Sequence, residues 1–357
     1  MFDYKSLKWL KDELSCFYAR RTATKNMGIQ QRLPKDFIKL VFQVIWFQIV
    51  VIPMFLWAVL MTILPSRRKS LKDEVVLITG AGNGLGKELA MQMAKKGCKL
   101  ALVDIKEEAV IKVANEINVR HGQVAKAYVA NLGISEDIST LAQRVLADFQ
   151  RVDILLNNAA LVFSGVKVHE HKDKEIDGMF RVNIMSHFMM MREFLPGMLQ
   201  RNHGHVAAIS SVASLGAGPN GSAYIATKWA TTGLMQSLRD ELREIPNNKV
   251  QVSNICPYFI NSGTDMSRMW NLRMPAISVE YAASSAIDGI QKNKFEFSIP
   301  WYHHPTFMVL KIVPQSIRDY FITIFYASMR SLSDEERTSL TTVKIMDETS
   351  KRVTGSV

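Results

Sequence analysis

Cysteine is scarce in this 357-residue sequence, which contains only Cys16, Cys98 and Cys256. The three lie far apart and form no CxxC pair, so we expect neither a disulfide framework nor a structural zinc site. The histidines have no accompanying pattern of cysteines or carboxylates, and we therefore expect no metal. We also expect no cleavable signal peptide, because a long segment precedes the first apolar run and no small-residue cleavage site follows it.

Positive charge is concentrated in the first 72 residues, which contain 13 Lys or Arg and 4 Asp or Glu. The rest of the chain is nearly balanced, with 31 basic and 29 acidic residues. A protein that binds nucleic acid would spread basic residues over its folded surface, so we expect no nucleic-acid partner. Basic residues around one apolar segment instead indicate attraction to anionic membrane lipid.

Residues 37–66 are predicted to form a membrane anchor. Leu40–Leu64 is 25 residues long with only three polar side chains, and as a helix of about 37 Å it could cross a hydrocarbon core of about 30 Å. Pro53 divides the run and basic residues flank both ends, so a single span and a bent hairpin are both open. Residues 1–36 carry apolar residues at helical spacing beside lysines, which predicts an amphipathic segment at a membrane interface, the alternative being a disordered basic tail.

Between residues 70 and 300 strand-like and helix-like patterns alternate, which predicts a parallel sheet with helices on both faces. The predicted strands are Val75–Thr79, Leu100–Asp104, Val124–Ala130, Ile154–Asn157, His205–Ser210, Val250–Cys256 and Phe295–Ile299. The clearest helices are Leu85–Lys96, Ile134–Phe149 and Ser222–Ile245.

Residues 301–330 are apolar again but too short to span a membrane. A lid over a substrate mouth, a second membrane-docking surface and packing against the sheet are the alternatives for this segment. Residues 331–357 are polar and mixed in charge, which predicts a disordered tail. Within residues 262–275, methionines and a tryptophan suit either an adaptable apolar pocket or packing.

The glycine-rich turn in Val75–Gly86, which reads VVLITGAGNGLG, is the strongest indication of a phosphate-bearing ligand. Glycines let backbone N–H groups approach a pyrophosphate, and a helix N-terminus adds partial positive charge. The turn therefore predicts a dinucleotide-binding βαβ unit. Asp104 ends the second strand about 20 residues further on, where a carboxylate binds ribose hydroxyls and repels a 2′-phosphate, so NAD is expected rather than NADP.

Four polar residues further along could carry proton chemistry. Tyr224 and Lys228 are four apart on a predicted helix and share one face. A tyrosine with a pKa of about 10 is a poor base, but a neighbouring ammonium and an oxidised nicotinamide both lower that pKa. Ser211 follows a strand end and could hold the reacting oxygen of a substrate. Asn183, in a helical stretch that begins near Asp173, could fix a water that links Lys228 to solvent.

In order and spacing these motifs resemble the signature of the short-chain dehydrogenase/reductase family. They are Thr79-Gly80-x-x-x-Gly84-x-Gly86, Asn157-Asn158-Ala159, Asn183, Ser211 and Tyr224-x-x-x-Lys228. The resemblance implies a doubly wound, mostly parallel, seven-stranded Rossmann fold, hydride transfer between a nicotinamide cofactor and an alcohol or carbonyl, and a homodimer.

The resemblance also implies a role for each residue. Tyr224 would be the general acid/base, Lys228 would lower its pKa and bind the nicotinamide ribose, and Ser211 would orient the substrate with Tyr224. Asn183 would support a proton relay through water. The cofactor would contact Thr79, Gly80, Asn83, Gly84, Leu85, Gly86, Asp104, Asn131, Asn158, Ala159, Tyr224, Lys228 and Pro257.

Three positions depart from the family pattern. Ala160 stands where the Asn-Asn-Ala motif usually ends in glycine, which adds a methyl group near the cofactor loop. Asn131 replaces an aspartate that commonly contacts adenine. Tyr258 follows Pro257 where glycine is common, so the loop over the nicotinamide is expected to differ in shape.

The anchor, the stretch Asn202–His205 and the Pro257-x-Phe259 loop resemble the membrane-bound branch that contains retinol dehydrogenases and 17β-hydroxysteroid dehydrogenases. We therefore expect NAD-dependent oxidation of a lipophilic alcohol, retinoid or steroid. The alternatives are an NADP-dependent reductase of retinal or other lipid carbonyls, and a non-catalytic scaffold at membranes or lipid droplets.

The resemblance and the sequence together suggest a location. A glycan on the sequon Asn220-Gly221-Ser222 would obstruct Tyr224, and the cysteines form no pairs, so we expect the catalytic domain to face the cytosol. We place it at the endoplasmic reticulum membrane, with lipid droplets as the alternative.

Overall fold

The computed structural model describes Phe42, Trp46, Ile49 and residues 67–163, 165–261, 270–325 and 328–329. The chain divides into two units between Ser66 and Arg67, and the sheet belongs to the second. The segments predicted at 1–36 and 331–357, and the predicted anchor at 37–66 apart from those three single positions, lie outside the described residues. In the described part of the chain, no helix has both the length and the apolar character needed to cross a bilayer.

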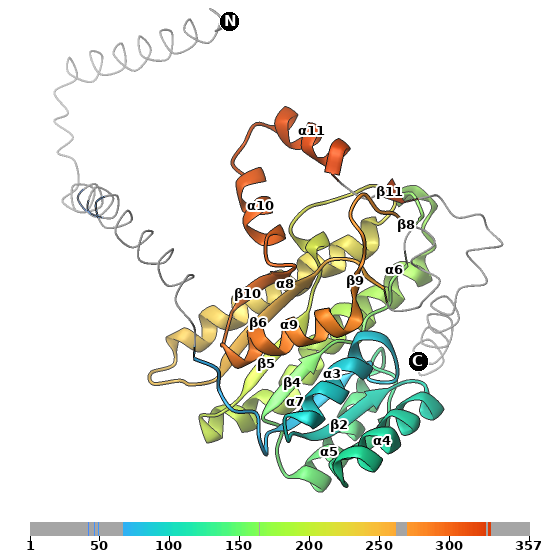
Figure 1. Ribbon diagram of the computed structural model, residues 1–357, viewed down its shortest axis with the longest axis vertical. Helices are drawn as coiled ribbons and strands as arrows, with labels where there is room; N and C mark the ends of the chain where they lie inside the picture. Colours follow the sequence, from blue (N-terminus) through green and yellow to red (C-terminus); the bar gives the residue numbers. More distant parts are fainter. Residues whose placement is uncertain are drawn as a thin grey trace, which may run out of the picture. The chain divides into compact units, whose positions relative to one another are not determined.

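Seven parallel strands form the central sheet, in the order β10-β6-β5-β4-β1-β2-β3 (Figure 1). Their bounds are β1 (Val75–Thr79), β2 (Lys99–Asp104), β3 (Ala125–Val129), β4 (Ile154–Asn157), β5 (His205–Ile209), β6 (Gln251–Pro257) and β10 (Glu296–Ile299). Each lies within one residue of its predicted bounds, so the predicted parallel α/β sheet is confirmed. Apolar strand sequences explain the arrangement, since a parallel sheet covered on both faces is buried throughout, as β1 is at all of its positions.

Helices cover both faces of this sheet (Figure 1). On one face lie α3 (Gly84–Lys95), α4 (Glu107–His121) and α9 (Val279–Gln291), and on the other lie α5 (Ser135–Phe149), α7 (Ser186–Arg201) and α8 (Ser222–Glu244). Because successive strand side chains point to opposite faces, Val76 and Ile78 join the first core and Leu77 the second. Met190 and Met191 of the methionine run at 189–191 are buried in the second core.

The helix that leads into α7 is interrupted. Helix α6 (Asp173–Phe180) continues into a π-helical turn, η2 (Arg181–Met185), before α7 begins. The sequence predicts the helical stretch but not this turn, which a hydrophobic pattern does not reveal. Such turns occur mostly singly and often at functional sites, and this one contains Asn183.

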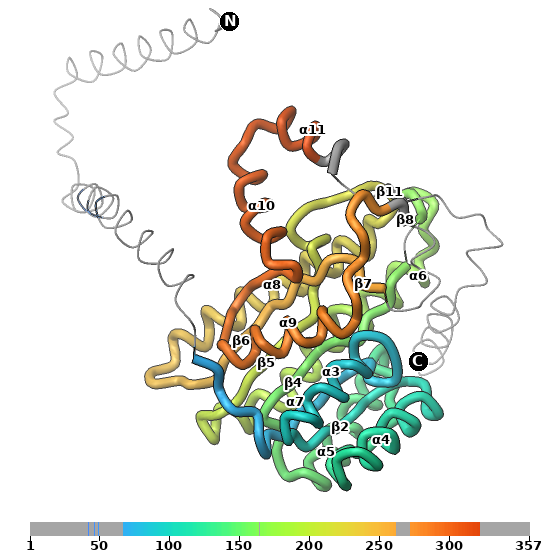
Figure 2. The backbone as a smooth tube through the Cα atoms, in the orientation of Figure 1, coloured from blue at the N-terminus to red at the C-terminus, as the bar shows by residue number. Residues whose placement is uncertain are grey.

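The remaining helices and strands described between the main elements are short. They are the 3-10 helices η1 (Val168–Glu170) and η3 (Val212–Ser214), the parallel pair β7 (Ile260–Asn261) and β9 (Ile277–Ser278), and the antiparallel pair β8 (Trp270–Asn271) and β11 (Ser328–Met329). The chain leaves β10 through α10 (His303–Leu310) and α11 (Gln315–Phe325), the orange-red part of the tube in Figure 2.

The predicted segment 301–330 has one face against the domain and another exposed. Phe307 and Leu310 are buried in a cluster with Leu215 and Cys256, so part of the segment packs beside η3. Large apolar side chains on the same segment are exposed, with Ile312 at 83%. Packing against the domain is thus one of its roles.

Candidate functional site

Most of the predicted site residues lie at or just after the carboxyl ends of β6, β5, β4, β1 and β2, which are neighbours in the sheet, whereas Asn183, Tyr224 and Lys228 are helical. Thr79, Asp104, Asn157 and Pro257 each end a strand, and Ser211 lies two residues after the end of β5. From β1 the chain winds toward β3, and from β4 it winds the other way toward β10. In open α/β sheets a ligand binds at the point where this direction reverses, here between β1 and β4.

The glycine turn leaves open backbone where a pyrophosphate could lie. Gly80 has φ +66°, a left-handed conformation that favours glycine, and a Cβ on Gly86 would overlap the Gly80 carbonyl. The turn leads into the N-terminus of α3, where Asn83 is exposed and Gly84 and Leu85 are partly buried. These positions fit the phosphates of a dinucleotide, with backbone N–H groups and the helix end facing them.

Two residues predicted to touch the cofactor, Thr79 and Asn158, form hydrogen bonds that hold this turn. The Thr79 hydroxyl accepts hydrogen bonds from the backbone N–H groups of Asn158 and Ala159, at 2.9 and 3.0 Å. The Asn158 amide donates to the carbonyls of Thr79 and Gly80, at 2.8 and 3.2 Å. These bonds join β1 to the chain after β4, so their first effect is to fix the shape of the turn.

The neighbouring Asn157 has an unsatisfied side chain. It is 1% exposed, and neither its amide nitrogen nor its amide oxygen has a hydrogen-bond partner among the described residues. A buried amide left without a partner costs about 1–3 kcal/mol. Its place at the end of β4, beside the glycine turn, fits a polar ligand or a bound water in the crevice.

Asp104 also supports the turn. Its carboxylate accepts hydrogen bonds from the backbone N–H groups of Gly82, at 2.8 Å, and Lys106, at 3.0 Å. A Cβ on Gly82 would lie 2.9 Å from an Asp104 oxygen, so the two positions are closely matched. The carboxylate is partly exposed and can still meet a ribose at the end of β2.

Asn131 follows β3 and Pro257 ends β6, on opposite sides of the point between β1 and β4. Asn131 is buried, and its side-chain oxygen accepts a hydrogen bond from the Gly133 N–H at 3.0 Å. Pro257 is buried and pairs with Ile299 of β10. The next residue, Tyr258, stands where the family commonly has glycine. Its ring stacks on His303 of α10 with ring centroids 4.8 Å apart, so this loop is joined to the C-terminal segment.

The structure brings Ser211, Tyr224 and Lys228 together. Tyr224 and Ser211 are hydrogen bonded, and the Lys228 Nζ lies 5.6 Å from the centre of the Tyr224 ring. Lys228 is 2% exposed and donates to the Ile209 carbonyl at 2.9 Å, at the end of β5. The Ser211 hydroxyl accepts from the Ala213 N–H and begins η3. A hydroxyl, a phenol and an ammonium thus meet at one edge of the sheet.

Burial shifts the pKa values of Tyr224 and Lys228 in the protein alone. Burial raises the pKa of Tyr224 to about 12, against the lowering effect of its hydrogen bond with Ser211. Burial also lowers the pKa of Lys228 to about 8. In the protein alone burial therefore dominates, because a low dielectric disfavours the charged form of both groups, and the lowering of the Tyr224 pKa by Lys228 stays a prediction.

Asn183 is fully buried and its side chain is occupied. The amide oxygen accepts from the Leu161 N–H at 2.7 Å, and the amide nitrogen donates to the Leu161 carbonyl at 2.9 Å and to the Thr227 hydroxyl at 3.1 Å. Its backbone carbonyl accepts from Thr231 at 3.3 Å. The amide therefore joins the loop after β4 to α8. Both atoms of the amide are already hydrogen bonded, so the predicted role of holding a water stays a prediction.

Sequence reasoning missed His187, which is 2% exposed on the first turn of α7. The Lys228 ammonium acts on this ring and contributes to lowering the pKa of His187, after the larger effect of burial. The signal was available, since His187 is four residues after Asn183 and so shares its helical face.

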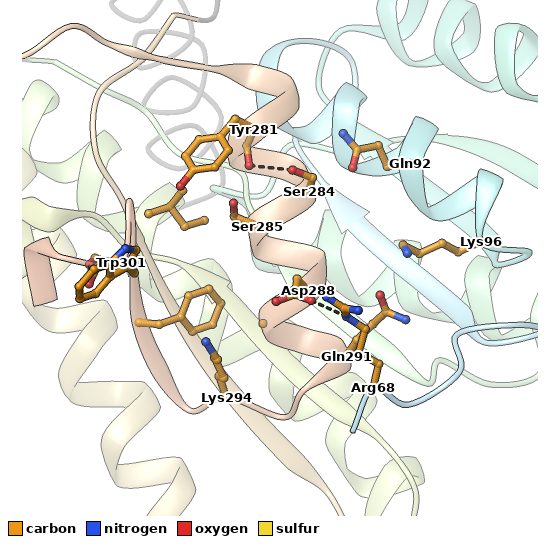
Figure 3. A pocket seen from close by; sticks show the side chains of 14 residues that line it. Arg68, Gln92, Lys96, Tyr281, Ser284, Ser285, Asp288, Gln291, Lys294 and Trp301 are labelled. Atoms are coloured by element: carbon orange, nitrogen blue, oxygen red, sulfur yellow. Dashed lines mark hydrogen bonds and ion pairs between the residues drawn. The ribbon is translucent and has the colours of Figure 1, made fainter. Parts of the chain in front are cut away.

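Two other features lie away from this site. A hollow of about 560 Å³ between α3, α9 and β10 is lined by Arg68, Lys96, Asp288 and Trp301 among others, and holds none of the predicted site residues (Figure 3). Glu74, Asp153 and His203 form the one cluster of potential metal ligands found in the described ranges. Arg151 and Arg201 lie 2.8 and 3.5 Å from Asp153, and their charge disfavours a bound cation there.

The chain belongs to the short-chain dehydrogenase/reductase family: the model for short chain dehydrogenases matches residues 74–274. It is therefore an oxidoreductase whose fold binds a nicotinamide cofactor. Human 17-beta-hydroxysteroid dehydrogenase 13 is 32% identical over 281 residues, which cover 78% of this chain and 92% of that protein. Mouse estradiol 17-beta-dehydrogenase 11 is 32% identical, covering 71% of this chain and 84% of that protein. These relatives lie in the branch that the sequence motifs resemble.

Bovine short-chain dehydrogenase/reductase family 16C member 6 is 34% identical, covering 72% of this chain and 82% of that protein. Among solved structures, a Burkholderia phymatum member in complex with NAD superposes with a TM-score of 0.60 at 24% identity, covering 71% of this chain and 96% of that one. A metagenomic short-chain oxidoreductase in complex with NADP gives 0.55 at 30% identity, covering 64% and 98%. Structural neighbours thus include complexes with both cofactors.

Proposed function

We propose that the protein is a membrane-anchored, NAD-dependent dehydrogenase that oxidises a lipophilic alcohol of the retinol or hydroxysteroid kind. The observation that carries the proposal is the meeting of Ser211, Tyr224 and Lys228 at the carboxyl end of β5, two strands along the sheet from β1 and its glycine turn. A phenol held by a hydroxyl, next to a buried ammonium, suits proton exchange with an alcohol. A scaffold protein has no physical need for this arrangement.

The residues of the chain would share the work of alcohol oxidation. Ser211 orients the hydroxyl oxygen, and Tyr224 accepts its proton. When bound, an oxidised nicotinamide supplies the hydride acceptor and a positive charge near Tyr224. Because the Tyr224 pKa is about 12 in the protein alone, added positive charge is needed to reach the phenolate near neutral pH. The buried Lys228, held by the Ile209 carbonyl, supplies part of it.

A preference for NAD rests on Asp104. A carboxylate at the end of β2 accepts hydrogen bonds from ribose hydroxyls and repels a 2′-phosphate. The glycine turn would hold the pyrophosphate through Gly80, Asn83, Gly84 and Gly86. Since cells usually keep the NAD pool oxidised, an NAD preference favours oxidation over carbonyl reduction.

Membrane attachment is supported by apolar surface. Phe42, Trp46 and Ile49 are helical, share one face by spacing, and are 60–68% exposed. Trp301 and Tyr320 are at least 70% exposed on the C-terminal segment. We propose attachment through residues 37–66 to the endoplasmic reticulum or to lipid droplets, with the catalytic domain facing the cytosol and α10 and α11 docked on lipid. A homodimer is proposed from the family alone.

The names of the relatives support the substrate class, because two of them denote dehydrogenases of 17-beta-hydroxysteroids and estradiol. An alcohol of this kind is scarce in water, and a domain held at lipid can receive it directly.

Cofactor reduction by membranes that contain the protein tests the proposal. All-trans-retinol and a panel of hydroxysteroids are offered with NAD and, separately, with NADP. We expect turnover with NAD that is lost in Tyr224→Phe and kept in the control Tyr281→Phe, which changes a 44%-exposed tyrosine of α9. Turnover with NADP alone would refute the NAD preference, and equal turnover in Tyr224→Phe would refute the assigned site.

A further inference from the structure

The buried histidine beside Lys228 has no assigned role. His187 is 2% exposed, and neither of its ring nitrogens has a hydrogen-bond partner among the described residues. Buried polar groups are nearly always hydrogen bonded, so an exception indicates an ordered water, a ligand or a functional role. An imidazole buried without any partner would destabilise the fold by about 1–3 kcal/mol.

The chemistry around His187 shows what it could bind. Burial and the Lys228 ammonium lower the pKa of His187 to about 3, so the ring is neutral near pH 7 and offers one donor and one acceptor nitrogen. Lys228 has three N–H groups, of which the described contacts use one, to the Ile209 carbonyl. His187 thus has an unused acceptor nitrogen, and Lys228, whose charge acts on this ring, has unused N–H donors.

Asn183 cannot take this place through its side chain. Leu161 and Thr227 occupy its amide at three positions between 2.7 and 3.1 Å. His187 lies one turn further along the same helical face, beyond the π-helical turn, and its nitrogens are open. His187 therefore has open side-chain nitrogens where Asn183 has none.

We propose that His187 is a positioning residue for Lys228, its ring nitrogen accepting a hydrogen bond from the ammonium through one bridging water. This bond holds Lys228 beside Tyr224 and gives the lysine a route for proton exchange with solvent. The proton that Tyr224 takes from the alcohol leaves through Lys228 and this water, so each turnover ends in the starting protonation state. The inference rests on the proposed function of Tyr224 and Lys228.

Two substitutions at His187 in the full-length protein distinguish the effect of its hydrogen bond to the water from the effect of its packing. His187→Phe keeps a ring and removes both nitrogens, whereas His187→Gln keeps an acceptor. We expect His187→Phe to lower kcat about tenfold with little change in KM, the scale of a hydrogen bond to a charged group, and His187→Gln to restore most of the loss. Similar values for the two variants, at equal thermal stability, would overturn the proposal.

The pH profile gives a readout that packing alone would not move. The titratable groups that act on Lys228 or lie beside it are Tyr224 on α8 and Cys256 on β6, and burial raises the pKa of each to about 12. In the protein without cofactor, a titration profile near pH 8 therefore reports Lys228. Because an accepted hydrogen bond favours the charged lysine, His187→Phe should move this pKa lower. An unmoved profile in His187→Phe would count against the proposal.

Nitrogen NMR of full-length protein with isotope-labelled histidine tests the contact without a substrate. We expect a hydrogen-bonded acceptor signal for His187 in the wild type, lost in Lys228→Met and kept in Lys294→Met, a control on an exposed lysine. The same signal in Lys228→Met would overturn the proposal. If the wild type turns over no alcohol, the proposed function fails, and the NMR result still decides whether His187 contacts Lys228.

Discussion

Replacing Asn183 with alanine should destabilise the protein, because its amide makes three hydrogen bonds inside the domain. It accepts from the Leu161 N–H at 2.7 Å and donates to the Leu161 carbonyl at 2.9 Å and to Thr227 at 3.1 Å. Asn183 is fully buried and Leu161 is 7% exposed, so water cannot easily replace the lost partner. At about 1–1.5 kcal/mol for each bond, the loss is roughly 3–4 kcal/mol, which lowers Tm by roughly 6–16 °C in a domain of this size.

Thermal unfolding followed by circular dichroism measures this change, and Asn118→Ala provides a matched control. The Asn118 side chain also makes three hydrogen bonds, with Val124 at 3.0 Å and with Ala125 at 2.8 and 2.9 Å. It is half-buried on α4, far from Tyr224 in the sheet order, so Asn118→Ala should lower Tm and leave turnover unchanged. Asn183→Ala should lower both. A Tm within about 1 °C of the wild type would refute the bracing role of Asn183.

Three further predictions concern the cofactor and the buried histidine. Gly86→Ala should abolish NADH binding, measured by fluorescence titration, because the new methyl group overlaps the Gly80 carbonyl, whereas Gly233→Ala, which meets nothing within 4 Å, should bind normally. Asp104→Asn keeps an acceptor for the Gly82 N–H and removes the negative charge. The affinity of this variant for NADP, measured by the same titration, should therefore rise about tenfold. An unchanged affinity would argue against Asp104 as the residue that discriminates NAD from NADP. The pKa of His187 falls from 6.5 to about 3 on folding, so the unfolded chain binds the extra proton and stability should fall as pH drops below 6.5. His187→Phe should therefore lose less Tm than the wild type between pH 6.5 and pH 5, and parallel losses would contradict the assigned pKa shift.

The sheet could be predicted because buried parallel strands are continuous apolar runs. Val75–Thr79 and Ile154–Asn157 have the bounds that the pattern predicts. The π-helical turn at Arg181–Met185 could not be predicted, since one extra residue per turn leaves little trace in a hydrophobic pattern. The short pair β8 and β11 depends on a contact between segments far apart in the sequence.

The sequence predicted which residues come together at the site, but not how their surroundings shift the pKa values. Motif spacing indicated Ser211, Tyr224 and Lys228, and the structure brings them together. It did not indicate that burial outweighs the Ser211 hydrogen bond in setting the Tyr224 pKa, because desolvation depends on packing from several elements. Nor did it show that Thr79 and Asn158 bond to each other's backbone, which is a tertiary contact.

Transfer of an isotope label tests the central claim most directly. An alcohol substrate carrying deuterium on its carbinol carbon is incubated with the full-length protein and NAD, and the reduced cofactor is analysed by mass spectrometry. We predict one deuterium in each reduced cofactor, formed by the wild type and not by Tyr224→Phe. Binding of NAD without label transfer from any retinol or hydroxysteroid, or transfer that persists in Tyr224→Phe, would contradict the proposed dehydrogenase site.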